Sequence, residues 1–439
     1  MYSRLIRSMT AVAIALLLVT VSAGVVFASG SSEQTQSKEL RFVAANHPFT
    51  DVIKTLIPEY EKQTGTKVTL ESYEENQLTQ KLTVEFASGS SSIDVFMTRP
   101  LQEGKLFAKN KYYEFLDSYL KNKTDASWDW KDFPASTVNA VTFDNQIYSV
   151  PIVTEWETLF YRKDLFQQAG IAVPKNLDEL FAAAKALNNP SKEVFGIVSR
   201  GQRGAAVTQF SSYLYNLGGD FITNGHASFN SPEAVKAFAF YGQMLGQYGP
   251  PGVTNMSWPQ AQALFASGKV AMWTDASTLI AGLLDPAKSQ VADKFGVAPF
   301  PVGPAGNHAY MVVPWALAIG AQSTNKDAAW TFLKWAASKE VATTSLLKGV
   351  TVARQSVWDD PAVVKQLFPG LSDSAKAIAQ TARSYDRPLM TAVGEARDAI
   401  GNVITQSIDN KGQGDLKSAA DGAVGTVDGL LQKAGELGQ

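Results

Sequence analysis

Cysteine is absent from the 439 residues of this chain. This absence excludes disulfide bonds, cysteine nucleophiles and sites in which thiolates hold zinc or iron–sulfur clusters. Histidine is scarce, because only His47, His226 and His308 occur and no two of them are spaced as a pair of metal ligands. We therefore expect no cofactor and no metal ion.

The chain also lacks a strong excess of charge of either sign. It has 39 basic and 41 acidic residues, a net charge of −2. A nucleic-acid-binding protein usually has a basic surface, so no nucleic-acid partner is expected. The hydrophobic content of 45% and charged content of 18% are typical of soluble globular protein. Single hydrophobic cores rarely grow beyond about 250–300 residues, so the length predicts two or three structural units.

Familiar enzyme motifs are missing as well. No GxGxxG follows a strand, no GxSxG is present, and Gly268-Lys269 lacks the rest of a P-loop. Carboxylates are plentiful, so the motifs alone leave a paired-carboxylate glycosidase open. We expect a binding protein that is not an enzyme.

The first residues have the form of a secretory signal. Arg4 and Arg7 precede an apolar run over residues 11–21, and small or apolar residues lead up to Ala28. The alternative is an uncleaved membrane anchor, since the apolar stretch is nearly long enough to span a bilayer. With no cysteine for lipid attachment, the exported protein is expected free in the periplasm. The expected divisions are a cleaved signal peptide at 1–28 and a flexible tail at 29–37.

The hydrophobic pattern then alternates between strand and helix. Short apolar runs near 40–45, 66–73 and 93–97 are separated by segments with helical spacing. This order predicts a parallel sheet covered by helices. The same alternation resumes beyond residue 150. Two such sheets imply a cleft between them, with ligands bound beyond the carboxyl ends of the strands.

Four of the nine tryptophans stand at a strand end or a helix start beside a polar residue or a proline. These are Trp156, Trp258, Trp273 and Trp315. A sugar has an apolar C–H face and a rim of hydroxyl groups, so it is bound by flat aromatic rings together with carboxylate, amide or guanidinium groups. Packing in the core is the alternative role for each single tryptophan.

Several segments resemble one known family. Residues 151–170 (PIVTEWETLFYRKDLFQQAG) resemble the signature segment of the extracellular sugar-binding proteins of ABC importers, the family of maltose-binding protein. That segment usually ends in Tyr-Asn or Tyr-Asp, whereas this chain has Tyr161-Arg162. Further segments are similar to the branch that binds sugars and sugar alcohols: 248–253, 264–275, 291–299 and 328–338.

The resemblance implies an α/β fold of two lobes, the type II-like periplasmic-binding-protein fold. Each lobe is expected to hold a mainly parallel sheet covered by helices, with a hinge of crossing segments. It also implies a monomer whose partners are a small carbohydrate and the permease subunits of an ABC importer. The expected divisions are lobe one at 38–150 plus 316–350, lobe two at 153–300 plus 356–437, and hinge segments near 150–153, 300–315 and 350–355.

Carry-over from the family places Glu155, Trp156, Trp273, Asp275 and Trp315 near the sugar. The loops that follow the strands add further candidates. The predicted ligand-binding residues are Asn46, His47, Arg99, Glu155, Trp156, Arg200, Arg203, Trp258, Trp273, Asp275, Trp315 and Arg354.

The leading function is therefore capture of a sugar or sugar alcohol between two closing lobes and its delivery to the permease. Four of the predicted residues are arginines, which also recognise carboxylate or phosphate. An acidic sugar or sugar phosphate is thus an alternative ligand. A periplasmic carbohydrate-active enzyme is a further alternative, which would need two carboxylates facing one scissile bond.

Overall fold

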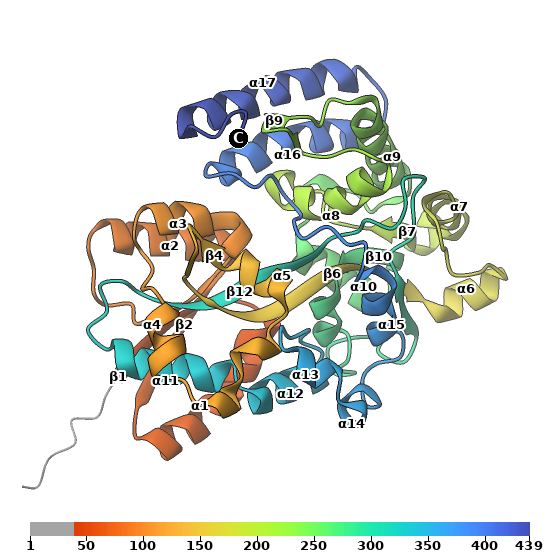
Figure 1. Cartoon of the computed structure of the whole chain (residues 1–439). Coiled ribbons are helices and arrows are strands. Elements are labelled where there is room, and N and C mark those ends of the chain that lie inside the picture. Colours follow the sequence, from red (N-terminus) through yellow and green to blue (C-terminus); the bar gives the residue numbers. More distant parts are fainter. Residues whose placement is uncertain (1–38) are drawn as a thin grey trace, which may run out of the picture. The chain divides into compact units, whose positions relative to one another are not determined.

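A computed structural model describes residues 39–439 of the chain (Figure 1). The predicted signal peptide, its cleavage site and the tail at 29–37 lie outside the described residues. Within the described range, buried residues form separate hydrophobic cores around two groups of strands. We call these two parts lobe one and lobe two.

Lobe one is built on three parallel strands in the order β2-β1-β3. Strand β1 (Glu39–Ala45) is almost entirely buried, which explains its unbroken apolar sequence. Helix α1 (Pro48–Thr64) begins after His47, whose side chain accepts a hydrogen bond from the Phe49 N–H, and it ends at Gly65, where φ is 68°. The other strands and helices of this part are β2 (Lys67–Tyr73), α2 (Glu75–Ala87), β3 (Val95–Thr98), α3 (Lys105–Lys109), α4 (Asp117–Asn122), α5 (Ala135–Ala140), β4 (Thr142–Phe143), β5 (Gln146–Ile147), α11 (Lys326–Ala336) and α12 (Lys339–Leu347).

Lobe two is built on the parallel pair β7 (Phe195–Val198) and β10 (Val270–Ala276). Helix α9 (Pro232–Tyr248) starts as its sequence predicts, with Ser231 as the cap and proline in the first turn. The other strands and helices here are α6 (Lys163–Ala169), α7 (Leu177–Leu187), α8 (Arg203–Asn216), β8 (Ile222–Thr223), β9 (His226–Ala227), α10 (Trp258–Ala266), β11 (Phe295–Pro299), α15 (Leu371–Ile378), α16 (Val393–Asp409) and α17 (Leu416–Ala434). Helices α13 (Gln355–Trp358) and α14 (Pro361–Val364) pack with α12 around a small separate core.

Two long strands join the lobes. Strands β6 (Val150–Arg162) and β12 (Met311–Ile319) pair antiparallel, and the sheet runs β2-β1-β3-β12-β6-β10-β7, with β11 also on β6. The first half of β6 pairs with β12, and the second half pairs with β10 and β11. In the main sheet the parallel pairs are β1 with β2, β1 with β3, and β7 with β10, and every antiparallel pair of that sheet involves β6 or β12. Two small antiparallel hairpins, β4-β5 and β8-β9, lie outside it.

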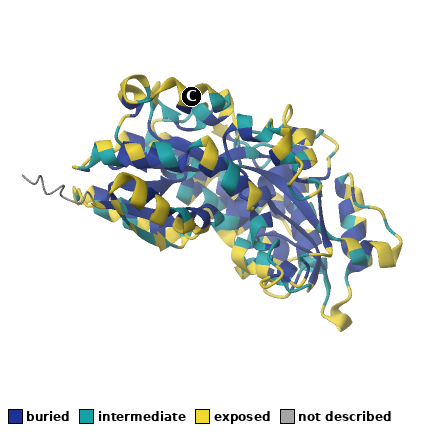
Figure 2. Cartoon of the chain, turned by 90° about the horizontal axis from the view of Figure 1, so that it is seen from below, coloured by how far each residue is buried: buried dark blue, intermediate teal, exposed yellow. Residues whose placement is uncertain are grey.

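The distribution of burial follows this plan. The strands are dark blue at the centre of Figure 2, and the exposed residues lie on the surrounding helices and loops. Each group of strands is therefore buried beneath helices, as expected for a sheet of near-continuous apolar strands. The predicted α/β class, with helices covering the sheets, is confirmed.

Candidate functional site

One face of β6 carries two buried carboxyl groups where the strand passes between the lobes. Glu155 lies 3.6 Å from His47, measured from its Oε1 to Nε2. Burial raises the pKa of Glu155, while the nearby His47 opposes that shift. The His47 ring in turn lies 5.5 Å from the ring of Trp315 on β12. The loop after β1 and both crossing strands therefore contribute to one polar cluster.

Lobe two adds a buried ion pair to this cluster. Arg200, in the loop after β7, binds Asp275 on β10 through Nε at 3.1 Å and Nη2 at 2.5 Å. Gln209 on α8 donates to the same carboxylate at 2.8 Å, and Trp273 Nε1 donates to it at 3.2 Å. Asp275 is fully buried, so these donors replace the water that it would bind when exposed.

Glu157 lies two residues beyond Glu155 and is fully buried. Burial and the neighbouring Asp275 raise its pKa well above the ordinary value. Its Oε1 has no hydrogen-bond partner among the described residues, and Oε2 accepts a long bond of 3.5 Å from Ser212. Burial and Asp275 therefore both favour the protonated form of Glu157.

In lobe one, an arginine and a glutamate form an ion pair. Arg99, after β3, donates from Nη1 to Glu75 Oε2 at 3.0 Å and is also bonded to Glu103 and Thr79. Burial alone would raise the pKa of Glu75, but Arg99 and Arg200 outweigh burial and lower it. Glu75 is therefore an ionised acceptor at the first turn of α2.

Trp258 joins the two lobes at this point. Its Nε1 donates to Glu75 Oε1 at 3.0 Å, so a residue at the start of α10 in lobe two reaches a residue of α2 in lobe one. Gln102 makes a second bridge, because its Oε1 accepts from Arg387 at 2.8 Å and from Arg397 at 2.5 Å.

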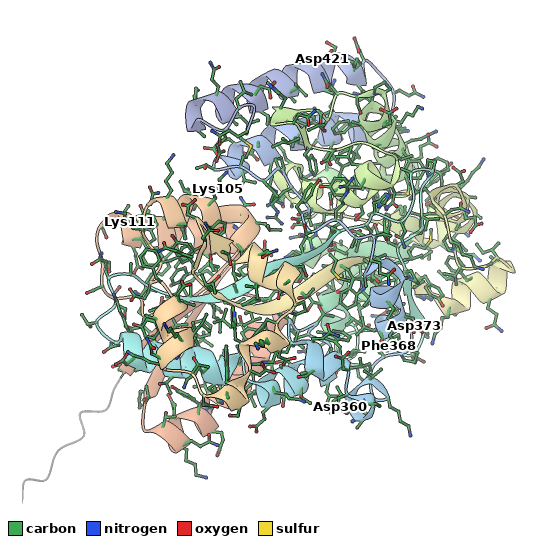
Figure 3. All side chains as sticks on the ribbon, in the orientation of Figure 1. Lys105, Lys111, Asp360, Phe368, Asp373 and Asp421 are labelled. Carbon is green, nitrogen blue, oxygen red and sulfur yellow. The ribbon has the colours of Figure 1, made fainter. Side chains whose placement is uncertain are left out.

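A third bridge lies farther out. Lys105 on α3 pairs with Glu436 at 2.5 Å, and Figure 3 labels this lysine on the rim of lobe one.

Two cavities open beside these bridges, and both lobes line each of them. A cavity of about 930 Å³ is lined by Asn46, His47 and Asp51 of lobe one and by Trp258, Gln262 and Lys288 of lobe two. A cavity of about 460 Å³ is lined by Glu75, Arg99 and Gln102 of lobe one and by Arg200, Arg203 and Arg397 of lobe two. Polar and charged groups from several elements thus converge on the space between the lobes, as in a small-molecule site.

Three predicted residues lie apart from these cavities. Trp156 points to the opposite face of β6, where its Nε1 donates to Ser374 at 2.9 Å. Trp273 is fully buried and stacks on Phe160 at 4.8 Å, so it packs in the core and contacts the cluster only through Asp275. Strand alternation accounts for Trp156, because its neighbours Glu155 and Glu157 occupy the other face.

Arg354 also serves the interior of the protein. It donates to the carbonyl oxygens of Ala337 and Trp128 at 2.6 and 2.8 Å and to Asp132 at 2.9 Å. Its guanidinium lies 4.8 Å from the ring centre of Trp128. Arg354 therefore ties its own loop to lobe one. The other nine predicted residues either line the two cavities or belong to the buried cluster beside them.

Several residues of the site are absent from those predicted from sequence. Glu75 follows strand β2, so the rule that places ligands after strands could have found it. Gln102, Gln209, Arg387 and Arg397 lie in helices or in an irregular C-terminal segment. Gln102 lies four residues beyond β3, so the same rule could have found it, whereas Gln209 and Arg397 reach the cleft through the packing of α8 and α16 and carry no motif.

Among residues 39–439, no group of three or more histidine and acidic side chains is placed to hold a metal ion. In the same range, none of the helices has both the length and the apolar character needed to span a bilayer.

Comparison with known proteins identifies the chain's family. Residues 46–343 match the model of the bacterial extracellular solute-binding proteins. The chain belongs to this family. The match covers both crossing strands and most residues around the cavities, whereas Arg387 and Arg397 lie beyond it.

Relatives and solved structures agree with this assignment. The chain is 34% identical to the mannitol-binding protein of Pseudomonas aeruginosa over 61% of each chain, and thus spans about three fifths of that relative. It is 27% identical to the erythritol/L-threitol-binding protein of Mycolicibacterium smegmatis over 71% of this chain and 70% of the relative.

A solved ABC transporter solute-binding protein from Agrobacterium radiobacter K84, in complex with ribitol, is 29% identical with a TM-score of 0.81. The likeness covers 90% of this chain and 98% of that structure. The two-lobed periplasmic-binding-protein fold is confirmed.

Proposed function

We propose that this protein is the extracytoplasmic binding component of an ABC importer and that it takes a sugar alcohol or a sugar between its two lobes. The observation that carries this proposal is the bridge from Trp258 to Glu75, which stands beside two cavities lined by both lobes. Trp258 offers an apolar ring and Glu75 an ionised acceptor for hydroxyl groups. These are the two kinds of group that a polyhydroxylated ligand needs.

The relatives support a polyol in particular. Two relatives are named as binding proteins for mannitol and for erythritol or L-threitol, and ribitol is bound in the solved structure from Agrobacterium radiobacter K84. All of these are open-chain sugar alcohols of four to six carbons. We infer that the ligand of this chain is of similar size, with a cyclic sugar as the second candidate.

We propose that the lobes close around the ligand by bending the crossing segments near 150–153, 300–315 and 350–355. Strands β6 and β12 pass through two of these segments, and the bridge between Val153 and Val352 ties in the third. Few residues would need to change backbone angles, as in other hinge closures. The lobe boundaries given in the sequence analysis follow from the same proposal.

Export, partner and activity complete the proposal. The chain is secreted through a cleaved signal peptide into the periplasm, acts as a monomer, delivers its ligand to permease subunits and catalyses no reaction. The family of extracellular solute-binding proteins supports this interpretation. Amino-terminal sequencing of the exported protein should begin at or near Ser29, and a mature chain that keeps Met1 would contradict it.

Thermal unfolding with a ligand panel tests the binding proposal. Ribitol, mannitol, erythritol and maltose are each added at increasing concentration, and one of them should raise the melting temperature, because a ligand stabilises by RT ln(1 + [L]/Kd). Trp258→Ala should weaken that ligand by ~10-fold or more, since buried aromatic contacts dominate such sites.

The matched control is Trp130→Ala, a partly buried tryptophan that stacks on Trp128 and Phe133 in lobe one. This variant should keep wild-type affinity. If no polyol or sugar stabilises the protein, the proposed ligand class is wrong.

A further inference from the structure

Three helices begin at the cavity of about 460 Å³. Its lining includes the first residues of α2 (Glu75–Ala87), α8 (Arg203–Asn216) and α16 (Val393–Asp409). The first N–H groups of a helix have no partner within the helix, and the helix dipole places partial positive charge there. A helix that starts at a cavity therefore favours a negative group inside it.

The start of α8 packs against Arg397 and Gly401 of α16. A side chain at Gly401 of α16 would meet the backbone of Arg203 at 2.3 Å, so glycine permits this close packing. A Cβ atom at Gly204 would lie 3.9 Å from Cβ of Arg397. First-turn residues of both helices, Gly204 of α8 and Gly394 of α16, line the same cavity.

Neither of these two helix starts is satisfied by a side chain. Gln202 before α8 and Ala392 before α16 make no capping hydrogen bond through a side chain. Helix α2 differs, because the Glu74 side chain accepts from Asn76 N–H at 2.9 Å. The two helix N-termini that lack a side-chain cap at this cavity therefore both belong to lobe two.

An arginine without an acidic partner stands at this place. Arg397 donates from Nη1 to Gln102 at 2.5 Å and from Nη2 to Thr208 at 3.4 Å, and no described carboxylate lies within 4.0 Å of it. Its Nε is buried and has no hydrogen-bond partner among the described residues. Arg387, which shares the Gln102 oxygen, is neutralised by Asp386 through bonds of 2.7 and 2.5 Å.

The electrostatic surroundings of Arg397 are unfavourable to its charge. Burial, and then Arg387 and Arg99, lower the pKa of the guanidinium well below its usual value, although the carboxylates of Asp386 and Glu75 oppose this shift. An arginine nevertheless stays protonated in proteins. A negative group nearby would relieve this repulsion.

Arg200 supplies a second donor. It is nine-tenths buried, lines the same cavity, and directs Nε and Nη2 at Asp275. Its Nη1 donates no hydrogen bond to any residue of the described range. Arg203, half-exposed at the first turn of α8, adds a third positive charge, 3.9 Å from the exposed Asp398. The guanidinium groups of Arg200, Arg203 and Arg397 thus line this cavity together with Arg99 and the carboxyl groups of Glu74, Glu75 and Asp398, and Nη1 of Arg200 is a donor left for a ligand.

We infer that the ligand of this protein carries a carboxylate or phosphate at one end, and that this group binds at the wall formed by Arg200, Arg397 and the starts of α8 and α16. This inference rests on the proposed function and narrows it, because the rest of the ligand remains a polyhydroxylated chain. Carboxylate and phosphate both accept the paired donors of arginine, so the experiment must separate them.

Isothermal titration with a matched series tests the inference. Ribitol, ribonate and ribitol 5-phosphate share one carbon skeleton, and so do mannitol, mannonate and mannitol 1-phosphate. At pH 7.5 one acidic member should bind ~10–100-fold more tightly than the neutral polyol, as expected for hydrogen bonds to charged groups. A gain in affinity for ribonate or mannonate would identify the anion as a carboxylate. A gain for ribitol 5-phosphate or mannitol 1-phosphate would identify it as a phosphate.

Variants then locate the effect. Arg397→Gln should reduce the preference for the acid over the polyol by ~10-fold or more. Arg203→Gln, at a half-exposed position that tolerates change, should reduce it by ~2–5-fold and serves if Arg397→Gln does not fold. Lys417→Gln is the matched control, because it removes one positive charge from exposed α17, and it should leave the preference unchanged.

The outcomes separate the two proposals. A neutral polyol that binds as tightly as both its acids would overturn the anion site and leave the proposed function standing. An acid preference that survives both arginine variants would also overturn it. Failure of every polyol, sugar and acid to bind would overturn the anion site together with the proposed function.

Discussion

The two faces of strand β6 differ in what packs against them. Glu155 and Glu157 face a buried polar cluster that holds His47 and the ion pair of Arg200 with Asp275. Trp156, between the two glutamates, faces the other way and packs edge-on against Trp358, with ring centres 5.6 Å apart. Three consecutive residues of β6 therefore alternate between a polar face and an apolar face of the strand.

The face of β6 on which Trp156 lies, here called the rear face, also borders a cavity of a different kind. It measures about 360 Å³ and is lined mainly by apolar side chains, among them Trp156, Met311, Val313 and Trp358. The two cavities between the lobes are bordered by charged residues. The comparison teaches that the side of β6 on which a residue falls decides whether it contributes charge to the cleft or apolar packing on the opposite face.

Breaking the ion pair of the polar face should have the largest effect. Asp275→Ala leaves Arg200 buried without its carboxylate and should lower the free energy of unfolding by ~3–5 kcal/mol. Asp275→Asn keeps the shape and part of the hydrogen bonding, so it should cost less. Urea unfolding of the ligand-free protein measures both. Equal stability of Asp275→Ala and wild type would show that this face is not held by the pair.

Changing the rear face should have a smaller effect on stability. Trp156→Phe removes the hydrogen bond to Ser374 and part of the ring, at a cost of ~1–2 kcal/mol in the free energy of unfolding. Ligand affinity should change by less than ~3-fold, since Trp156 lies outside the cleft. Calorimetry of both quantities checks this. A loss of affinity with unchanged stability would instead place Trp156 in contact with the ligand.

The buried acid of the polar face should make stability depend on pH. An unfolded glutamate releases its proton near pH 4.5, whereas buried Glu157 keeps its proton to higher pH. Above that pH the folded state holds more protons than the unfolded state, so the free energy of unfolding falls as the pH rises, and the contribution is lost through the raised pKa.

Glu157→Gln should remove this dependence. Relative to the variant, wild type should lose up to ~1.4 kcal/mol per pH unit above pH 4.5. Urea unfolding at pH 5, 6, 7 and 8 gives the slope for both proteins, and Glu59→Gln, at an exposed position on α1, is the control. Parallel slopes for wild type and Glu157→Gln would mean that Glu157 is ionised in the folded protein.

The bridge between the lobes should give the smallest change. Trp258→Phe keeps an aromatic ring but loses the hydrogen bond to Glu75, so we expect ligand affinity to fall by ~3–10-fold and the free energy of unfolding to fall by less than ~1 kcal/mol. Titration calorimetry measures the ligand affinity, and urea unfolding measures the free energy of unfolding. If Trp258→Phe loses more stability than ligand affinity, the main role of Trp258 is to stabilise the contact between the two lobes.

Much of the fold was open to prediction because it depends on local patterns. The mainly apolar run at 40–45 became a buried strand, and Ser231 caps α9 with Pro232 in its first turn, a common local signal for a helix start. Gly268, with φ of 77°, follows the end of α10 in the left-handed region that favours glycine. Burial and backbone preference act within a few residues, so the sequence displays them directly.

The site was less predictable, since the identity of a residue does not state which way it points. Trp273 and Arg354 have the chemistry of ligand-binding residues, yet one packs in the core and the other ties a loop to lobe one. Gln102 and Arg397 carry no motif and nevertheless meet across the cleft. Their meeting depends on how α16 packs on α8, a contact between segments nearly two hundred residues apart.

By itself the sequence determined the two α/β units, the expected export signal and the resemblance to solute-binding proteins, because all three rest on short-range hydrophobic patterns and local motifs. Only the tertiary structure decided which face of β6 each residue occupies and which arginines remain without an acid. Those features depend on the partners that long-range packing supplies, and a charge is neutralised or left free by the neighbours it meets in space.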